Sequence, residues 1–183
     1  MAAARPSAWT IEEFLAFEAE EPERHEFVGG VVRTMTGGTA AHSAIKGNVA
    51  FALDQALRRA PCRALLSDLK VLTPTAVLYP DVLVTCRPLA PDDDRLSDPT
   101  AVVEVLSPAS ETFDRIYKWR EYQRITSLRH FVLIEQKERR IEVWSRTGAG
   151  WELVTVEPPD DAIALDAIDA ALSLEALYRD SGR

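Results

Sequence analysis

The segment Ala101–Leu106, with the sequence AVVEVL, constrains the fold more than any other part of the chain. Apolar residues on both sides of a strand are typical of a strand at the centre of a sheet that is covered on both faces. Val102, Glu104 and Leu106 would share one of those faces. A carboxylate there loses its hydration, at a cost of several kcal/mol, unless a cation pairs with it. The alternative is an edge strand with Glu104 in water; the apolar flanks favour burial and a functional role for Glu104.

The other patterns predict helices and strands in an order that suits a mixed sheet. Thr10 and Glu13 form a capping-box pattern at the start of a first helix, and Gly29-Gly30 between two β-prone runs predicts a hairpin. The predicted helices span residues 10–20, 40–59, 112–125 and 173–179. The predicted strands span residues 63–72, 78–86, 101–106, 130–135, 139–146 and 151–156, and residues 88–99 form a polar loop. This order favours an α/β fold of the mixed α+β kind over a sandwich or a helical bundle.

Length and composition bound the class of protein. At 183 residues the chain fits one domain, 1–183, with a substantial core. It has no run of about 18 apolar residues that could span a bilayer. Its first residues, MAAARPSAWT, lack a signal-peptide core, so we expect a cytoplasmic protein with no membrane partner. Cys62 and Cys86 lack metal-ligand spacing, and we expect reduced thiols rather than a disulfide or a zinc site.

The charge of the chain is unevenly distributed. A formal net charge of −8 argues against binding of nucleic acid over the whole surface. Residues 115–146, which we call the basic strip, nevertheless hold nine Lys or Arg against four Glu. The basic strip could face phosphates, and an ordinary solvated helix and hairpin would have the same composition. Both interpretations stay open at this point.

Asp81 follows Pro80 at the start of the apolar run Val82–Val84. Such an Asp is equally well explained as a turn residue. If Asp81 lies on a strand next to that of Glu104, a functional role becomes the better explanation. Two carboxylates a few ångströms apart repel each other, which favours a divalent cation between them.

Short motifs are spread along most of the chain in a specific order. They are Glu26–Gly30, His42, Tyr79–Val82, Val103–Pro108, Asp114–Lys118 with Tyr122, and Ser127–Leu133. Together they resemble the Uma-type putative restriction endonucleases, a family of the PD-(D/E)XK nuclease superfamily. The resemblance covers about residues 10–178 and rests on the order and spacing of the motifs rather than on any one of them.

The resemblance implies a restriction-endonuclease-like core with flanking helices and extra β-hairpins. It also implies that Asp81 and Glu104 are catalytic metal ligands, with Glu26 as the acidic residue that precedes them. Oxygen ligands of this kind suit Mg²⁺ or Mn²⁺. Such an ion lowers the pKa of a bound water and polarises a phosphodiester. The implied activity is that of a metal-dependent endonuclease acting on DNA, and the resemblance leads us to expect a homodimer.

The chain departs from the superfamily at the catalytic lysine. The usual pattern places a lysine two residues after the second acid, where this chain has Leu106. Lys118, on the following predicted helix, is the first candidate to supply the missing ammonium, and Lys70 is the second. An ordinary solvated position for Lys118 is equally compatible with the sequence.

Three further residues are candidates for substrate binding. Arg115 and Arg120 could anchor phosphates that flank the scissile bond, and His42 could contact the site or have a structural role. The competing hypothesis is a non-catalytic binding or assembly module that keeps the nuclease fold and has lost the chemistry. Leu106 and the net charge of −8 both favour that alternative.

Overall fold

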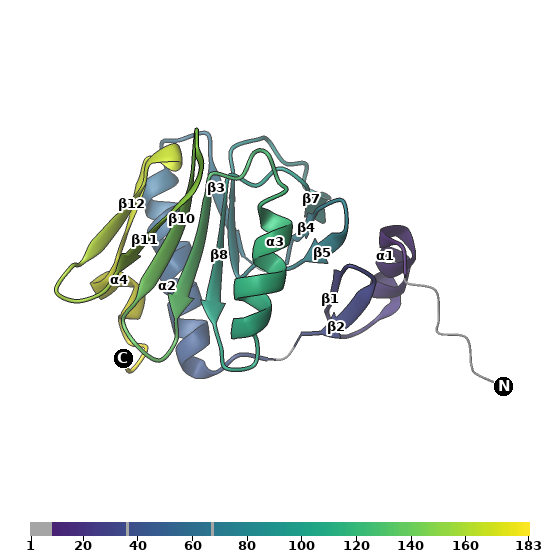
Figure 1. Ribbon diagram of the computed structural model, residues 1–183, viewed down its shortest axis with the longest axis horizontal. Helices are drawn as coiled ribbons and strands as arrows, with labels where there is room; N and C mark the ends of the chain where they lie inside the picture. Colours follow the sequence, from purple (N-terminus) through teal and green to yellow (C-terminus); the bar gives the residue numbers. More distant parts are fainter. Residues whose placement is uncertain (1–8, 36, 67) are drawn as a thin grey trace.

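A computed structural model describes residues 9–35, 37–66 and 68–183 and shows a mixed α/β architecture (Figure 1). The helices are α1 (Ile11–Glu20), α2 (Ala40–Leu57), the π-helix η1 (Phe113–Lys118), α3 (Trp119–Tyr122), the 3-10 helix η2 (Asp166–Ile168) and α4 (Leu174–Tyr178). The strands are β1 (His25–Val28), β2 (Val31–Thr34), β3 (Arg63–Leu66), β4 (Lys70–Leu72), β5 (Ala76–Leu78), β6 (Val82–Thr85), β7 (Arg95–Leu96), β8 (Ala101–Leu106), β9 (His130–Glu135), β10 (Ile141–Thr147), β11 (Gly150–Val156), β12 (Ala162–Leu165) and β13 (Ala170–Ser173).

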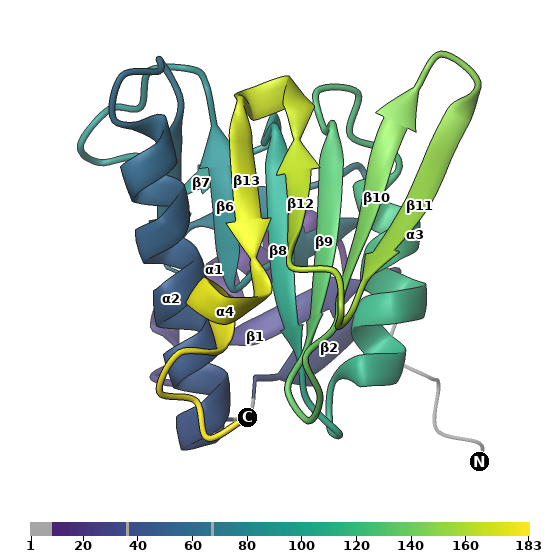
Figure 2. The same cartoon turned by 90° about the vertical axis from the view of Figure 1, so that its left-hand side faces the viewer.

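A six-stranded mixed sheet forms the centre of the molecule, in the order β11-β10-β9-β8-β6-β3. β8 and β9 are parallel, and the other pairs are antiparallel. Figures 1 and 2 show α2, α4 and the β12–β13 hairpin over one face of this sheet and α3 over the other. β8 therefore has strand neighbours on both edges and cover on both faces, which confirms the prediction of a central strand.

The side chains of β8 divide between two cores according to the alternation of the strand. Val103 and Val105 join the apolar face of α2 in one cluster of buried residues. Val102 and Leu106 join Tyr122 in a second cluster on the α3 side. Glu104 shares that second face and is only 2% exposed. The predicted assignment of faces is confirmed, and Glu104 is a buried carboxylate.

A five-stranded sheet in the order β2-β1-β5-β4-β7 lies beside the larger one (Figure 1). Its β1–β2 hairpin turns at Gly29 and Gly30, whose φ angles are +56° and +91°. Two successive positive φ values are costly for residues with a Cβ, so the glycine pair fits this tight turn. α1 begins at the predicted capping box and packs Phe14 against Phe27 of β1.

The predicted fold class is confirmed, but two predicted strands were wrong. The predicted strand 63–72 is two strands, β3 and β4, that belong to different sheets. The predicted strand 78–86 is likewise divided into β5 and β6 on either side of Pro80, which has no N–H to donate to a strand ladder. Both errors arise where the chain passes from one sheet to the other.

Other differences concern short elements. The predicted helix 112–125 is the π-helix η1 followed by one turn of α3, and the polar loop 88–99 contains the short strand β7. The β12–β13 hairpin was not predicted, because its apolar residues alternate over only four positions in each strand. Among the described residues, no helix is both long and apolar enough to cross a bilayer.

The expectation of reduced cysteines was wrong, because Cys62 and Cys86 form a disulfide. β3 pairs with β6 so that Arg63 lies opposite Thr85. Extending that register by one residue places the two cysteines opposite each other. The sequence separation of 24 residues gives no indication of this pairing, which depends on the adjacency of two strands that are not consecutive.

Truncation of Leu53 tests the packing of α2 on the central sheet. Leu53 is fully buried against this face. We expect Leu53→Ala to lower the free energy of unfolding by about 2–5 kcal/mol, since it removes buried methyl groups and leaves a cavity. Phe51 lies on the same helix and is 63% exposed, so Phe51→Ala should change it by no more than about 0.5 kcal/mol. Urea denaturation of both variants checks the contrast, and equal effects would contradict this packing.

Candidate active site

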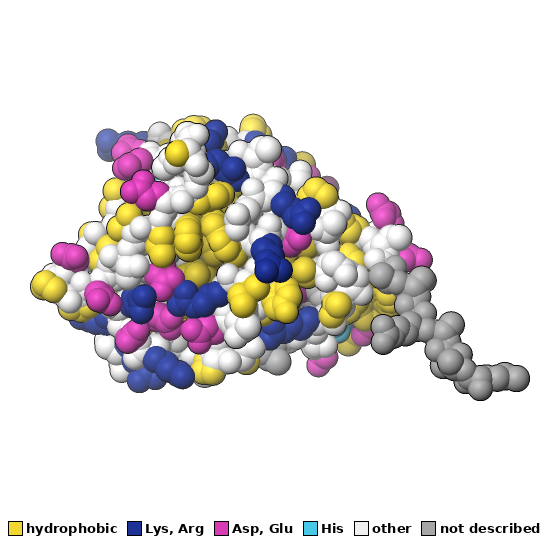
Figure 3. All heavy atoms as spheres, viewed as in Figure 1, with side chains coloured by type: hydrophobic (Ala, Val, Ile, Leu, Met, Phe, Trp, Pro, Cys, Tyr) yellow, Lys and Arg dark blue, Asp and Glu magenta, His cyan; other side chains and the backbone are white. Residues whose placement is uncertain are grey.

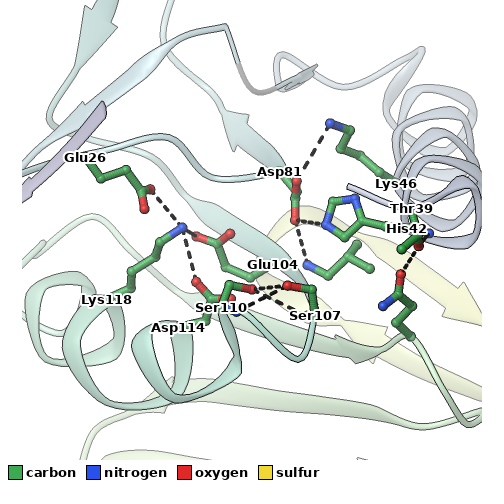
Figure 4. A network of polar contacts seen from close by, with 12 residues as sticks. Glu26, Thr39, His42, Lys46, Asp81, Glu104, Ser107, Ser110, Asp114 and Lys118 are labelled. Carbon is green, nitrogen blue, oxygen red and sulfur yellow. Dashed lines mark hydrogen bonds and ion pairs between the residues drawn. The ribbon is translucent and has the colours of Figure 1, made fainter. Parts of the chain in front are cut away.

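Asp81 and Glu104 lie opposite each other on neighbouring strands. In the antiparallel pair of β6 and β8, Val82 is opposite Val103, and the next step of the register places Asp81 opposite Glu104. The amide of Val105 donates a 2.8 Å hydrogen bond to Oδ2 of Asp81, which holds this carboxylate beside β8 (Figure 4). Both acids line a single pocket.

Lys118 extends from η1 into the same pocket and meets three carboxylates (Figure 4). Its Nζ lies 2.8 Å from Oε1 of Glu26, 3.1 Å from Oε1 of Glu104 and 3.2 Å from Oδ1 of Asp114. Lys118 is itself only 4% exposed. Burial alone would lower the pKa of Lys118, but the three carboxylates outweigh it and raise that pKa well above its ordinary value. The ammonium is therefore charged and buried, not solvated.

The π-helical geometry of η1 places Asp114 and Lys118 on its inward face. The N–H of Trp119 donates to the carbonyl of Asp114, five residues earlier, as in a π-helix. Asp114 is 2% exposed, and its Oδ1 has no hydrogen bond with ideal geometry although it lies within ion-pair distance of Lys118. π-Bulges are frequent at functional sites, and this one supplies two charged residues of the pocket.

Glu104 is almost completely shielded from solvent. Its Oε1 accepts a 2.8 Å hydrogen bond from the hydroxyl of Tyr122 in addition to the contact with Lys118. Burial raises the pKa of Glu104 well above its ordinary value, and the charges of Asp114 and the other acids add to the rise, while Lys118 opposes it. The negative charge of Glu104 thus depends on a nearby cation.

Glu26 reaches this group from β1 of the smaller sheet. Its Oε1 accepts a 3.0 Å hydrogen bond from the backbone N–H of Tyr79. Glu26 as a whole is 4% exposed, and it lines the pocket. The Tyr79 hydroxyl in turn donates to Glu18 at 2.9 Å. The hydrogen bond from the Tyr79 amide holds Glu26 against the segment that joins β5 to β6.

Asp81 has its own set of partners on α2. His42 Nε2 lies 3.3 Å from Oδ2 of Asp81, and Lys46 Nζ lies 3.8 Å from its Oδ1 (Figure 4). Burial would raise the pKa of Asp81, but the hydrogen bond and charge of His42 and the amide of Val105 outweigh it and lower that pKa below its ordinary value. Asp81 is therefore an ionised carboxylate that faces the pocket.

The pocket holds more acidic than basic groups. Its charged lining residues are Glu26, Arg33, Asp81, Glu104, Asp114 and Lys118. Four carboxylates thus stand against two permanent cations, so the pocket has an excess of negative charge. Within residues 9–35, 37–66 and 68–183, no three His, Cys, Asp or Glu side chains are grouped so as to hold a metal ion. Three of the acids converge on the Lys118 ammonium instead.

Three other predicted residues lie outside this pocket. Lys70 pairs with Asp94 at 3.0 Å. Arg115 makes ion pairs of 2.6 Å with both Glu135 and Glu142. Arg120 is exposed on α3. The structure therefore brings together Glu26, His42, Asp81, Glu104 and Lys118, and leaves Lys70, Arg115 and Arg120 apart from them.

Part of the basic strip is paired within the strip itself. Arg124 and Arg140 pair with glutamates of the same segment. Arg146 donates to backbone carbonyls, among them that of Leu128, and its guanidinium lies over Trp151. Figure 3 shows basic and acidic side chains next to each other on the face that carries α3 and the β10–β11 hairpin. This arrangement favours the solvated helix and hairpin over a phosphate-binding surface.

Four residues at the site were missing from the predicted set: Arg33 and Asp114, which line the pocket, and Lys46 and Tyr122, which contact Asp81 and Glu104. Helical spacing gives a signal for two of them, since Lys46 is one turn after His42 and Asp114 is one turn before Lys118. Tyr122 is again one turn after Lys118. Arg33 has no such signal, because only the position of the β1–β2 hairpin brings it to the pocket.

A solved structure shares this fold. A crystal structure described as a putative nuclease belonging to DUF820, from Anabaena variabilis, superposes with a TM-score of 0.75 at 20% identity. The match covers 93% of this chain and 97% of the other. At that identity it shows the fold alone, a mixed α/β fold.

Sequence comparison identifies the family. Residues 11–176 match the model of the Uma2 family, described as "Putative restriction endonuclease". An uncharacterized protein of Synechocystis sp., slr1290, is 31% identical over 92% of this chain and 90% of its own length. A second, sll1609, is 27% identical over 85% of this chain and 90% of its own length. The chain belongs to the Uma2 family, which confirms the resemblance seen in its motifs.

Removal of the Lys118 ammonium tests the buried charge cluster. Lys118→Met should lower the free energy of unfolding by about 3–5 kcal/mol near neutral pH, because buried carboxylates would lose their cation. Lys118→Met combined with Glu104→Gln should regain part of that loss, since one of the unpaired charges is then absent. Denaturant titrations in EDTA measure both. A loss below about 1 kcal/mol for Lys118→Met would contradict the cluster as described.

Proposed function

We propose that this chain is a metal-dependent endonuclease that hydrolyses phosphodiester bonds in DNA, in the cytoplasm. The observation that carries the proposal is the position of Asp81 opposite Glu104 in one pocket, with the Lys118 ammonium 3.1 Å from Glu104. Membership of a family described as putative restriction endonucleases supports it. A pair of acids with a neighbouring lysine is the set of groups that such a hydrolysis requires.

The residues of the pocket fit a divalent cation. The donor set consists of carboxylate oxygens, which Mg²⁺ and Mn²⁺ prefer. Four carboxylates outnumber the cations Arg33, Lys46 and Lys118 at the pocket, which favours a further positive charge. Asp81 and Glu104 would hold the ion, and Glu26 is the third candidate ligand. Bound there, the ion would supply Lewis acidity and a water of lowered pKa.

The remaining chemistry belongs to side chains of the chain itself. Lys118 would donate hydrogen bonds to a phosphate oxygen and stabilise the extra negative charge of the transition state. Asp114 and Glu26 keep that ammonium charged and oriented. His42 and the Val105 amide hold Asp81 ionised and in place. A scissile phosphate would therefore bind between Lys118 and the pair of acids.

Cleavage assays with Mg²⁺ and with Mn²⁺ test the assigned roles. Asp81→Asn and Glu104→Gln should each lower kcat/KM by roughly 10²-fold or more, because metal-ion catalysis is worth several kcal/mol. Lys118→Met should lower it by about 10²–10³-fold, as for the loss of one donor to a developing charge. Lys70→Met is the matched control, since Lys70 pairs with Asp94 outside the pocket. It should stay within about twofold of the wild type.

The pattern across these variants decides the assignment. Equal trace cleavage by wild type and Glu104→Gln would mean that the activity comes from a contaminant and would overturn the proposal. Loss of activity with Lys70→Met but not with Lys118→Met would transfer the catalytic role to Lys70. Circular dichroism of each variant separates loss of chemistry from loss of folding.

The second candidate function is a binding or assembly module without catalysis. One observation favours it: the Lys118 ammonium already meets three carboxylates, as in a structural ion-pair cluster. Leu106, at the usual lysine position, is 2% exposed in the apolar core. In this case the pocket would stabilise the fold and the chain would bind nucleic acid or another protein elsewhere.

Calorimetric titration with Mn²⁺ separates the two functions. The endonuclease proposal predicts one saturable site that Asp81→Asn weakens by about 10-fold or more, because it removes a charged ligand. Asp94→Asn is the control, since it removes a carboxylate outside the pocket. No saturable binding at millimolar metal, with the protein folded, would support the module without catalysis.

A further inference from the structure

An exposed aromatic and apolar surface adjoins the candidate site. Tyr117 of η1 is 49% exposed and Val31 at the tip of the β1–β2 hairpin is 67% exposed. Between them is a pocket of about 360 Å³ whose lining residues are Val28, Val31, Val32, Arg33, Phe113 and Tyr117. We call these six residues the aromatic shelf. Large apolar groups that are exposed together on a protein surface often mark a binding site.

The aromatic rings of the shelf are arranged next to a cation. The ring centroids of Phe113 and Tyr117 are 5.8 Å apart with an interplanar angle of 30°. The guanidinium carbon of Arg33 lies 4.4 Å from the Phe113 centroid. Arg33 also donates a 2.6 Å hydrogen bond to the carbonyl of Ala109, so its side chain is held in position. The shelf thus combines π-faces with a fixed positive charge.

The shelf is continuous with the pocket of Glu104 and Lys118. Arg33 and Phe113 line both cavities. Nζ of Lys118 lies 5.9 Å from the centroid of the Phe113 ring. A ligand with a phosphate at Lys118 would therefore place its neighbouring group on this shelf.

We propose that the aromatic shelf stacks an unpaired nucleobase next to the scissile phosphate. The substrate would then be a nucleic acid that is single-stranded at this point, such as a single strand, a flap or a junction. This inference rests on the proposed function for the position of the scissile phosphate. The reason is geometric: a base within a duplex has both π-faces covered by its neighbours, so only an unstacked base offers a face to Tyr117.

Charge complementarity favours a nucleotide over an apolar peptide as the occupant. The chain carries a net charge of −8, so an approaching phosphate needs a local cation, and Arg33 supplies one at the edge of the rings. Aromatic rings with an adjoining Arg are typical of surfaces that bind single-stranded nucleic acid.

Binding of fluorescent oligonucleotides to the full-length protein tests the proposal. The probes are a single-stranded oligothymidine and a blunt duplex of equal length, measured by anisotropy in EDTA and in Mg²⁺, with gels to verify that they are intact. Tyr117→Leu keeps an apolar side chain without a π-face. It should weaken single-strand binding by roughly 5- to 140-fold, the range for loss of one base-stacking contact. Duplex binding should stay within about twofold.

Two further variants are controls. Tyr117→Phe keeps the ring and should bind the single strand as the wild type does. Phe51 of α2 is an exposed aromatic residue, at 63% against 49% for Tyr117. It lies nine residues, or two and a half helical turns, from His42 and so on the opposite side of that helix. Phe51→Leu should change neither affinity. An equal effect of Tyr117→Leu and Phe51→Leu, or no effect of either, would overturn the shelf as a base-binding site.

The remaining outcomes separate this inference from the proposed function. Tyr117-dependent single-strand binding without cleavage under any condition would support the shelf and contradict the endonuclease. Cleavage that Tyr117→Leu leaves unchanged on both substrates would support the endonuclease and overturn the shelf. The alternative occupant of the shelf is a second copy of the chain, and light scattering tests it by measuring the oligomeric state. If the wild type is a dimer and Tyr117→Leu is a monomer, the shelf is a dimer interface and the proposal is overturned.

Discussion

The ammonium of Lys118 lies against carboxylates from three separate parts of the chain. Glu26 comes from β1 of the smaller sheet, Glu104 from β8 of the larger sheet and Asp114 from η1, and all three lie within 3.2 Å of Nζ. Each carboxylate is nearly inaccessible to solvent. Burial of three acids without a cation would cost several kcal/mol for each. Lys118 therefore links the two sheets and η1 at the pocket, beside the apolar cluster that both sheets share with α3.

The same cluster sets the electrostatic character of the site. Lys118 balances only part of the charge of its three partners, while Asp81 is held ionised on the opposite side by His42 and a backbone amide. The excess of acidic groups thus comes from side chains that ion pairs and hydrogen bonds hold in place in the pocket lining, and not from flexible surface residues. Under the proposed function, this excess of acidic groups would attract a divalent cation, and the bound cation would attract a phosphate.

Much of this could be predicted from residues whose local pattern determines their position. Alternation along β8 places Glu104 on the face of Leu106, and the capping box of Thr10 fixes the start of α1. The sequence does not reveal the adjacency of strands that are far apart in the chain. For that reason the Cys62–Cys86 disulfide was not predicted, and a single strand was predicted where β3 and β4 enter different sheets. The basic strip was ambiguous for a related reason, since ion pairs such as Arg115–Glu142 form only when η1 packs on β10.

The position of the lysine follows from the same packing. Leu106 shares the face of Glu104 but belongs to the apolar cluster with Tyr122, where a second ammonium would be buried without a partner. Lys118 approaches Glu104 from the helix above that face, and Asp114 lies one helical turn before it on η1. The pocket therefore has an ammonium beside Glu104, and a helix supplies it in place of β8. The path of η1, which also carries Phe113 and Tyr117, thus couples the position of the ammonium to the surface beside the pocket.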